Sequence, residues 1–266
     1  MYGTSLIIGC DSFIGRALFQ YFNSRTTHVV GTTRRAGTSH LFLNLDEDLS
    51  LWKLPRSVGV AYLCAAITNL DFCEKDSART RYINVERTQM LIDTLLAQGT
   101  YVVFLSSDLA QQPTTEYGFQ KQMVERFLSG KNATVVRLGK VLTAEAGLLA
   151  EWVGELEAGR PIEPFDDYYF APISLEKVVA VLGDEEWLGF HPKILISAIE
   201  PLSYFHAIDF IAEKRALDRS LIVPKSSGAK KPEGLTFHRH FKEYRFCAWN
   251  TLTELFGVNL PADVVY

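Results

Sequence analysis

Two side chains that could transfer a proton together, Tyr117 and Lys121, stand four residues apart in this sequence. Residues at this spacing share one face of a helix, so a helix here would place the phenol beside the ammonium. The positive charge favours the phenolate and lowers the pKa of the tyrosine, which predicts an acid or base that works near neutral pH. The same spacing also occurs by chance on many solvated helices, so the pair indicates a site only if the chain supplies its other parts.

A glycine-containing turn near the N-terminus is the first such part. The short apolar run 6–8 is typical of a strand buried in a parallel sheet, and a helical pattern begins directly after the turn that follows it. With the second apolar run, 28–33, these pieces make a βαβ unit. Glycines permit a close approach of main-chain N–H groups to a pyrophosphate, and the helix N-terminus attracts its negative charge. The residues predicted to hold a dinucleotide there are Gly9, Ser12, Phe13, Ile14 and Gly15.

Two residues of this turn are unusual for a dinucleotide site. Ser12 takes the place of the middle glycine, where its hydroxyl can still donate to a phosphate, and Asp11 adds a negative charge nearby. A strand-to-helix turn that binds no ligand is the alternative. The order of strand, turn, helix and strand favours the cofactor.

The end of the second strand predicts which dinucleotide binds. An NAD site carries an acid about 20 residues past the glycine turn, whereas an NADP site tends to place arginine there. Arg34 and Arg35 stand at this position, and no acid lies between Asp11 and Asp46. The sequence therefore predicts NADP(H) rather than NAD(H), with a solvated arginine pair as the alternative.

Further apolar runs predict the strands that complete the sheet, at 41–43, 58–64, 101–105 and 134–138. Asn44 and Leu45 follow the first of these and are expected at the adenine. Ala65 and Ala66 follow the second, where small residues let the backbone pass close to a cofactor. Ser107 follows the third, at the edge where ligands meet parallel sheets.

The chain resembles the extended short-chain dehydrogenase/reductase family, and within it the dTDP-dehydrorhamnose reductase branch. The likeness covers about residues 4 to 215 and is strongest before 140. Beyond the residues already named, it rests on local matches at 65–71, at Asn84-Val85, at Ser106-Ser107-Asp108, and at Phe165-Asp166-Asp167 followed by Ala171-Pro172-Ile173.

The resemblance implies roles for the residues of the site. Tyr117 is the general acid that protonates a carbonyl oxygen, Lys121 bonds the nicotinamide ribose and lowers the tyrosine pKa, and Ser107 holds the carbonyl oxygen. Thr68 and Asp108 are expected at the substrate. Asn84 matches a family position, and packing or helix capping is the larger expectation for it. The loop 111–116 is shorter than is usual in the family, which leaves the substrate's identity open.

The expected fold class is α/β: a doubly wound, Rossmann-like parallel sheet with a smaller C-terminal substrate subdomain. Residues 1–142 form the predicted NAD(P)-binding domain. Residues 143–266 form a mixed α/β substrate-binding part that interleaves with it. The segment 224–232 is linker-like and basic, so its lysines either meet a substrate diphosphate or lie on a solvated loop.

Composition excludes several other classes of protein. The chain has 266 residues, 47% of them hydrophobic, with a formal charge of −4, so nucleic acid and anionic membranes are not expected partners. Four cysteines without paired spacing predict free thiols, with neither a metal site nor disulfides. The N-terminus lacks the pattern of a signal peptide, which predicts a cytoplasmic protein. Family habit suggests a homodimer.

Three functions remain open on this sequence. The first is an NADP(H)-dependent reductase or epimerase that acts on a keto group of a sugar, attached to a nucleotide, with Tyr117 as the general acid. The second is a non-catalytic regulatory subunit that binds a dinucleotide with the same fold. The third is a lyase or isomerase that holds its cofactor tightly without net redox chemistry.

Overall fold

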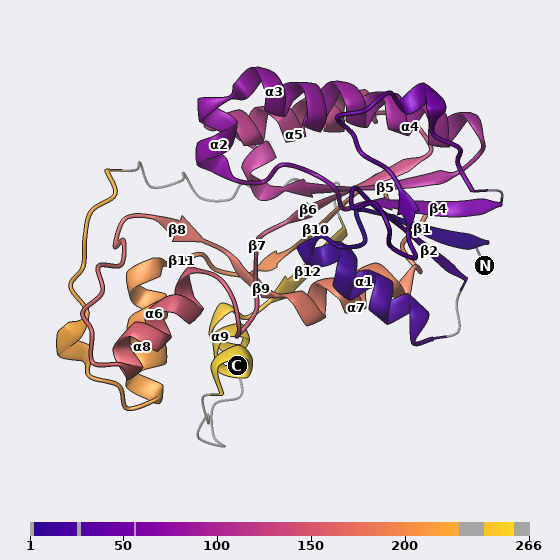
Figure 1. Cartoon of the computed structure of the whole chain (residues 1–266). Helices are drawn as coiled ribbons and strands as arrows, with labels where there is room; N and C mark the ends of the chain where they lie inside the picture. Colours follow the sequence, from indigo (N-terminus) through magenta and orange to yellow (C-terminus); the bar gives the residue numbers. More distant parts are fainter. Residues whose placement is uncertain (1–2, 26–27, 56, 229–241, 258–266) are drawn as a thin grey trace. The chain divides into compact units, whose positions relative to one another are not determined.

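The computed structural model describes residues 3–25, 28–55, 57–228 and 242–257 (Figure 1). The chain divides into two compact units, of which the first contains residues 1–138 and 179–195. The second contains residues 139–178 and 196–266. The predicted segment 224–232 is described only as far as 228, so Lys230 and Lys231 lie outside the described residues.

Eight strands form the main sheet, in the order β12-β10-β6-β5-β4-β1-β2-β3. The pairs from β6 to β3 are parallel, and the chain order reverses at β1, which lies between β2 and β4. The predicted doubly wound sheet is thereby confirmed. The strand bounds are β1 Thr4–Ile8, β2 Val29–Thr33, β3 Leu41–Phe42, β4 Val58–Leu63, β5 Tyr101–Ser107, β6 Ala133–Leu138, β10 Lys193–Ala198 and β12 Lys242–Phe246.

Helices cover both faces of this sheet. On one face lie α2 to α5, and α1 lies on the other with the second half of α7 (Figure 1). The central strands are apolar on both sides because both faces are covered, and Leu6, Ala61 and Val102 are fully buried. The helix bounds are α1 Phe13–Asn23, α2 Leu70–Lys75, α3 Ser77–Arg81, α4 Thr88–Ala97, α5 Glu116–Phe127 and α7 Leu175–Asp184.

One helical stretch differs from its predicted form. The sequence predicts one helix over 77–98, but α3 and α4 are joined by a π-helical turn, Tyr82–Arg87. Such turns widen the helix by one residue and occur often at functional sites. Asn84 lies inside this turn and is buried.

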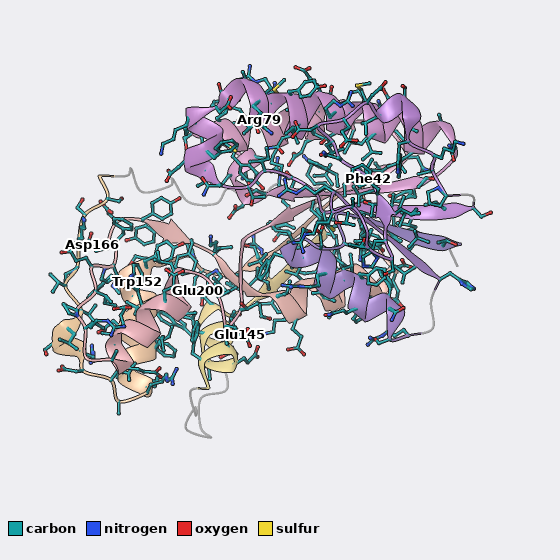
Figure 2. The ribbon with its side chains drawn as sticks, in the orientation of Figure 1. Phe42, Arg79, Glu145, Trp152, Asp166 and Glu200 are labelled. Atoms are coloured by element: carbon teal, nitrogen blue, oxygen red, sulfur yellow. The ribbon has the colours of Figure 1, made fainter. Side chains whose placement is uncertain are left out.

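The second unit has its own core. Two short strand pairs, β7 with β9 and β8 with β11, stand beside helices that bury aromatic side chains. The ring of Phe170 stacks on that of Tyr204 at 4.4 Å between centroids. Trp152, which is labelled in Figure 2, meets the Tyr204 ring edge-on. The bounds are β7 Lys140–Leu142, α6 Leu148–Glu157, β8 Tyr169–Phe170, β9 Pro172–Ser174, β11 Leu202–Ser203, α8 Tyr204–Lys214 and α9 Ala248–Phe256.

The described residues include neither a membrane-crossing helix nor a cluster of metal ligands. None of the helices that the structure describes is long and apolar enough to cross a membrane. Within the same residues, His, Cys, Asp and Glu side chains form no cluster that could hold a metal ion.

Candidate functional site

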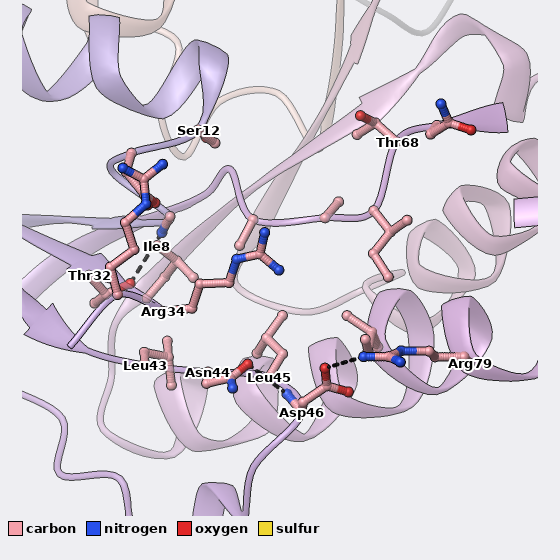
Figure 3. A pocket seen from close by; sticks show the side chains of 18 of the residues that line it. Ile8, Ser12, Thr32, Arg34, Leu43, Asn44, Leu45, Asp46, Thr68 and Arg79 are labelled. Carbon is pink, nitrogen blue, oxygen red and sulfur yellow. Dashed lines mark hydrogen bonds and ion pairs between the residues drawn. The ribbon is translucent and has the colours of Figure 1, made fainter. Parts of the chain in front are cut away.

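A cavity of about 620 Å³ opens in the first unit where β1, β2, β3 and β4 end (Figure 3). Its walls come from the glycine turn after β1, the end of β2, the loop after β3 and the segment that follows β4. Nine of the predicted site residues line it: Gly9, Ser12, Arg34, Arg35, Asn44, Leu45, Ala65, Ala66 and Thr68.

The glycine turn leaves no room for side chains at two positions. Gly9 has a φ of +81°, and a Cβ atom there would lie 2.9 Å from that of Ala65. A Cβ on Gly15 would lie 2.2 Å from the carbonyl oxygen of Gly9. The hydroxyl of Ser12 caps α1 by accepting from the Gly15 N–H at 3.2 Å. The turn therefore fits the cradle that a pyrophosphate needs, with main chain at its surface.

The two predicted arginines have different surroundings. Arg34 extends into the cavity, toward the loop that carries Ala65 to Thr68 (Figure 3). Arg35 also lines the cavity, but its Nε lies 3.1 Å from a carboxylate oxygen of Asp11. One arginine faces the cavity with no ion-pair partner among the described residues, and the other is paired with the glycine turn.

Long-range contacts hold the loop after β3. Asp46 accepts a hydrogen bond at 2.9 Å from Arg79, which is exposed on α3 and also lines the cavity (Figure 3). The buried Arg87 donates from Nε to the carbonyl oxygen of Leu45 at 3.1 Å. Sequence reasoning missed both arginines, because nothing local to either one indicates a partner so far along the chain.

Asn84 fixes the segment that follows β4. Its Oδ1 accepts from the N–H of Ile67 and its Nδ2 donates to the carbonyl oxygen of Ile67, both at 2.8 Å. The same Nδ2 also donates to Gln120 on α5 at 2.8 Å. The sequence predicted packing or capping for Asn84, whereas its side chain bridges the cavity wall and the helix of Tyr117.

Capping interactions fix the start of α5, the helix that carries Tyr117 and Lys121. Thr115 accepts from the N–H of Gly118 at 3.2 Å, and Glu74 accepts from the N–H of Glu116 at 2.7 Å. A Cβ on Gly118 would lie 2.7 Å from the carbonyl oxygen of Leu109, so only glycine lets the helix pack this closely. The position of Tyr117 is set by these contacts.

Tyr117 and Lys121 lie together on α5, as the spacing predicted. The Lys121 Nζ is 5.6 Å from the centre of the Tyr117 ring and 4.7 Å from that of Phe104. It donates a hydrogen bond to the carbonyl oxygen of Leu105 at 2.8 Å. The ammonium is thus directed at the end of β5 and lies near the face of the phenol ring.

The predicted lowering of the Tyr117 pKa is wrong for this structure. Burial raises the pKa of the Tyr117 phenol, and the nearby Cys73 and Asp108 raise it further. Burial also lowers the pKa of the Lys121 ammonium, to about 8. Spacing along a helix indicates which groups are neighbours, but it does not include the desolvation that dominates here.

Ser107 and Asp108 meet each other at the end of β5. The Ser107 hydroxyl donates to the Asp108 carboxylate at 3.0 Å and accepts from the N–H of Leu109 at 3.2 Å, so it also caps the short helix that follows. Burial raises the pKa of the Asp108 carboxyl. Seven predicted site residues are not among those that line the cavity: Phe13, Ile14, Gly15, Ser107, Asp108, Tyr117 and Lys121.

Three solved structures illustrate the folds to which this chain is similar. The dTDP-4-dehydrorhamnose reductase of Bacillus anthracis str. Ames, in complex with NADP, has a TM-score of 0.78 and 16% identity over 96% of this chain and 99% of its own. The UDP-glucose 4-epimerase of Thermotoga maritima, with UDP-glucose, has a TM-score of 0.69 and 16% identity, covering 96% and 93%. MoeE5 in complex with UDP-glucose and NAD has a TM-score of 0.69 and 18% identity, covering 98% and 95%.

Comparisons of sequence give a family and no individual relative. No curated protein matches the chain at a significant level. The sequence profile of the NAD dependent epimerase/dehydratase family matches residues 5–168, which is more than half of the chain. That match agrees with the glycine turn, the reversal of strand order at β1 and the cavity beside it. The chain belongs to the NAD-dependent epimerase/dehydratase family, and with it to the NAD(P)-dependent oxidoreductases and epimerases of the extended short-chain type.

Proposed function

We propose that the protein is an NADP(H)-dependent reductase or epimerase that acts on a keto group of a nucleotide-sugar. One observation carries this: the cavity of the first unit combines a glycine cradle with an arginine that faces inward. Similar folds support the substrate class, because the B. anthracis reductase is named for a dTDP-sugar and MoeE5 holds UDP-glucose.

The residues of the cavity and of the glycine turn beside it suit the parts of a dinucleotide. Gly9, Ser12 and Gly15 would hold the pyrophosphate, with Phe13 and Ile14 in the first turn of the helix behind them. Asn44 and Leu45 would meet the adenine, and Arg34 a phosphate on the adenosine ribose. When bound, the nicotinamide supplies or takes up the hydride.

Tyr117 would deliver the proton to the keto oxygen as that oxygen becomes an alkoxide. A raised pKa makes the phenol a weak acid, but an alkoxide is a far stronger base, so the transfer remains favourable. Ser107 would hold the same oxygen through its hydroxyl. In the oxidative direction Tyr117 must act as a phenolate, and that reaction should speed up as the pH rises.

The buried ammonium of Lys121 would anchor a ribose hydroxyl, exchanging or sharing its hydrogen bond to Leu105. We assign Thr68 and Asp108 to the substrate, and the second unit to the nucleotide-sugar. The homodimer and the cytoplasmic location remain predictions of the sequence.

The proposal is tested first by binding and then by turnover. We expect NADPH to bind the purified protein in a fluorescence titration, and one nucleotide-sugar to raise the melting temperature further when NADPH is present. Tyr117→Phe should lower the turnover of a keto sugar by about 100-fold or more with little change in NADPH affinity. Tyr82→Phe is the matched control, because that phenol is exposed on the π-helical turn.

Each outcome separates the candidate functions. A protein that binds no dinucleotide would contradict both the enzyme and the non-catalytic binder. Binding without turnover of any keto nucleotide-sugar would favour the regulatory subunit. Turnover that Tyr117→Phe leaves unchanged would remove Tyr117 as the proton donor.

A further inference from the structure

Asp11 links the glycine turn to the end of β2. Its Oδ2 accepts a hydrogen bond from the Thr33 hydroxyl at 2.9 Å and lies 3.1 Å from the Nε of Arg35. Thr33 is the last residue of β2 and is buried, and its hydroxyl also accepts from the N–H of Arg35 at 3.1 Å. These two contacts hold the carboxylate at the edge of the cavity, where the Asp11 side chain is 28% exposed.

This contact places a carboxylate at the end of β2, where the sequence itself has no acidic residue. NAD sites carry an acid at the end of the second strand, where it bonds the hydroxyls of the adenosine ribose. This chain has Thr33, Arg34 and Arg35 there, but Asp11 reaches the same strand end from the turn. One edge of the cavity therefore carries the Asp11 carboxylate from the turn and the inward-facing cation of Arg34, the residue that follows β2.

The charges at this edge oppose each other. Arg34 faces the cavity, and among the described residues it has no carboxylate partner. Asp11 offsets the charge of Arg35. A phosphate on the adenosine ribose would be attracted by Arg34 and repelled by Asp11, whereas a hydroxyl could donate to Asp11 at no electrostatic cost.

We propose that Asp11, held by Thr33 and Arg35, is a specificity-determining residue that keeps the preference for NADPH over NADH small. This inference rests on the proposed dinucleotide function and goes beyond it. Arg34 favours the phosphate and Asp11 favours the hydroxyl, so the same cavity accepts both cofactors. The Asp11–Arg35 pair sets the balance between them.

The test compares two affinities in the intact chain. Dissociation constants for NADPH and NADH are measured by fluorescence titration for the parent and for Asp11→Asn, which keeps an acceptor for Thr33 but removes the charge. We expect NADPH to bind about tenfold more tightly in the variant and NADH to bind no better, because the repulsion between Asp11 and the phosphate is removed and Arg35 loses the carboxylate that offsets its charge. The matched control is Asp93→Asn, an exposed carboxylate on α4 that pairs with Lys131 and does not line the cavity.

A second variant should change the ratio of the two affinities in the opposite direction. Arg35→Ala leaves the Asp11 charge unpaired, so NADPH should bind several-fold more weakly while NADH keeps its affinity. In the double variant Asp11→Asn/Arg35→Ala the ratio of the two affinities should move back toward that of the parent. Thermal melting shows whether each variant is folded.

Other outcomes would overturn the inference. Equal shifts of both affinities in Asp11→Asn, or an equal change of their ratio in Asp93→Asn, would show that Asp11 does not discriminate between the cofactors. If the folded parent bound neither dinucleotide, the proposed function would fail and this inference with it. If NADPH bound the parent and the ratio did not move, only the inference would fail.

Discussion

Lys121 on α5 donates a hydrogen bond from its Nζ to the carbonyl oxygen of Leu105 on β5, at 2.8 Å. The ammonium therefore reaches across from the helix to the sheet and fixes how the two elements meet. Lys121 is almost fully buried, and the ring of Phe104 lies beside its charge. The site thus contains a cation that costs free energy to bury, and this cost depends on pH.

We expect Lys121 to make the protein more stable as the pH rises from about 8 toward the range of a free lysine. Burial lowers its pKa to about 8, so between that value and the unfolded pKa the unfolded chain binds more protons, and the free energy of unfolding increases with pH. In Lys121→Met this contribution, at most about 3 kcal/mol, should be absent.

Denaturant unfolding at several pH values measures the effect as the difference between parent and variant. Lys131→Met is the control, because that ammonium is partly exposed and pairs with Asp93. A parent-minus-variant difference that stays flat above pH 8 would contradict the lowered pKa.

Gly15→Ala should abolish dinucleotide binding. The added Cβ would lie 2.2 Å from a main-chain oxygen of Gly9 and 2.8 Å from the Ser12 hydroxyl, so the turn must move. We expect a loss of about 1–3 kcal/mol in stability as well. Gly154→Ala on α6 is the control, since its added Cβ would have no atom within 4 Å apart from its chain neighbours and the backbone of its own helix, and alanine favours a helix by about 0.5–1 kcal/mol. Calorimetric unfolding and NADPH titration check both, and a Gly15→Ala protein that binds NADPH normally would exclude the turn as the pyrophosphate site.

Arg137→Met should destabilise the protein by about 3–5 kcal/mol, because it leaves the buried Glu125 carboxylate without its main partner. Arg137 donates two hydrogen bonds to Glu125, at 2.9 and 2.7 Å, and Ser106 and Lys193 donate the others. Arg160→Met removes a solvent-exposed partner of Glu155 and should cost less than about 1 kcal/mol. Denaturant unfolding measures the free energy of unfolding of both variants. Equal losses in Arg137→Met and Arg160→Met would contradict the prediction.

The Glu125 carboxylate should also make the stability of the protein fall at low pH. Burial alone would raise the pKa of Glu125, but the hydrogen bonds from Arg137, Lys193 and Ser106 outweigh it and hold the pKa below its usual range. Its contribution is therefore present above the unfolded pKa and is lost as the pH falls through the folded one. In the variant Glu125→Gln that loss should disappear from the acid limb of the stability curve.

Asn84→Leu should destabilise the protein by about 2–4 kcal/mol, because it removes partners from both main-chain groups of Ile67 and from Gln120. NADPH affinity should fall with it, since Ile67 lines the cavity. Asn132→Leu, at an exposed position outside the cavity, should change neither by a measurable amount. If Asn84→Leu kept the affinity of the parent, the side chain would have no part in shaping the cavity.

The sequence predicted the fold well because burial on both faces leaves a local signature. Continuous apolar runs marked β1, β4 and β5, and the glycine turn marked the start of α1. Helical spacing also placed Tyr117 beside Lys121. The sequence could not predict effects that come from distant residues. These are the pairing of Asp11 with Arg35, the hydrogen bonds between Asn84 and Ile67, and the desolvation that raises the Tyr117 pKa. Each depends on which surfaces meet after folding.

The π-helical turn at Tyr82–Arg87 determines the directions in which the side chains of the following helix, α4, point. With 3.6 residues per turn, one additional residue rotates everything after it by about 100° around the helix axis. That rotation lets Asn84 face the cavity wall while Leu91 and Leu95, on α4, face the sheet. Deleting a single residue from the turn would restore a regular helix and force the chain to give up one of these two alignments.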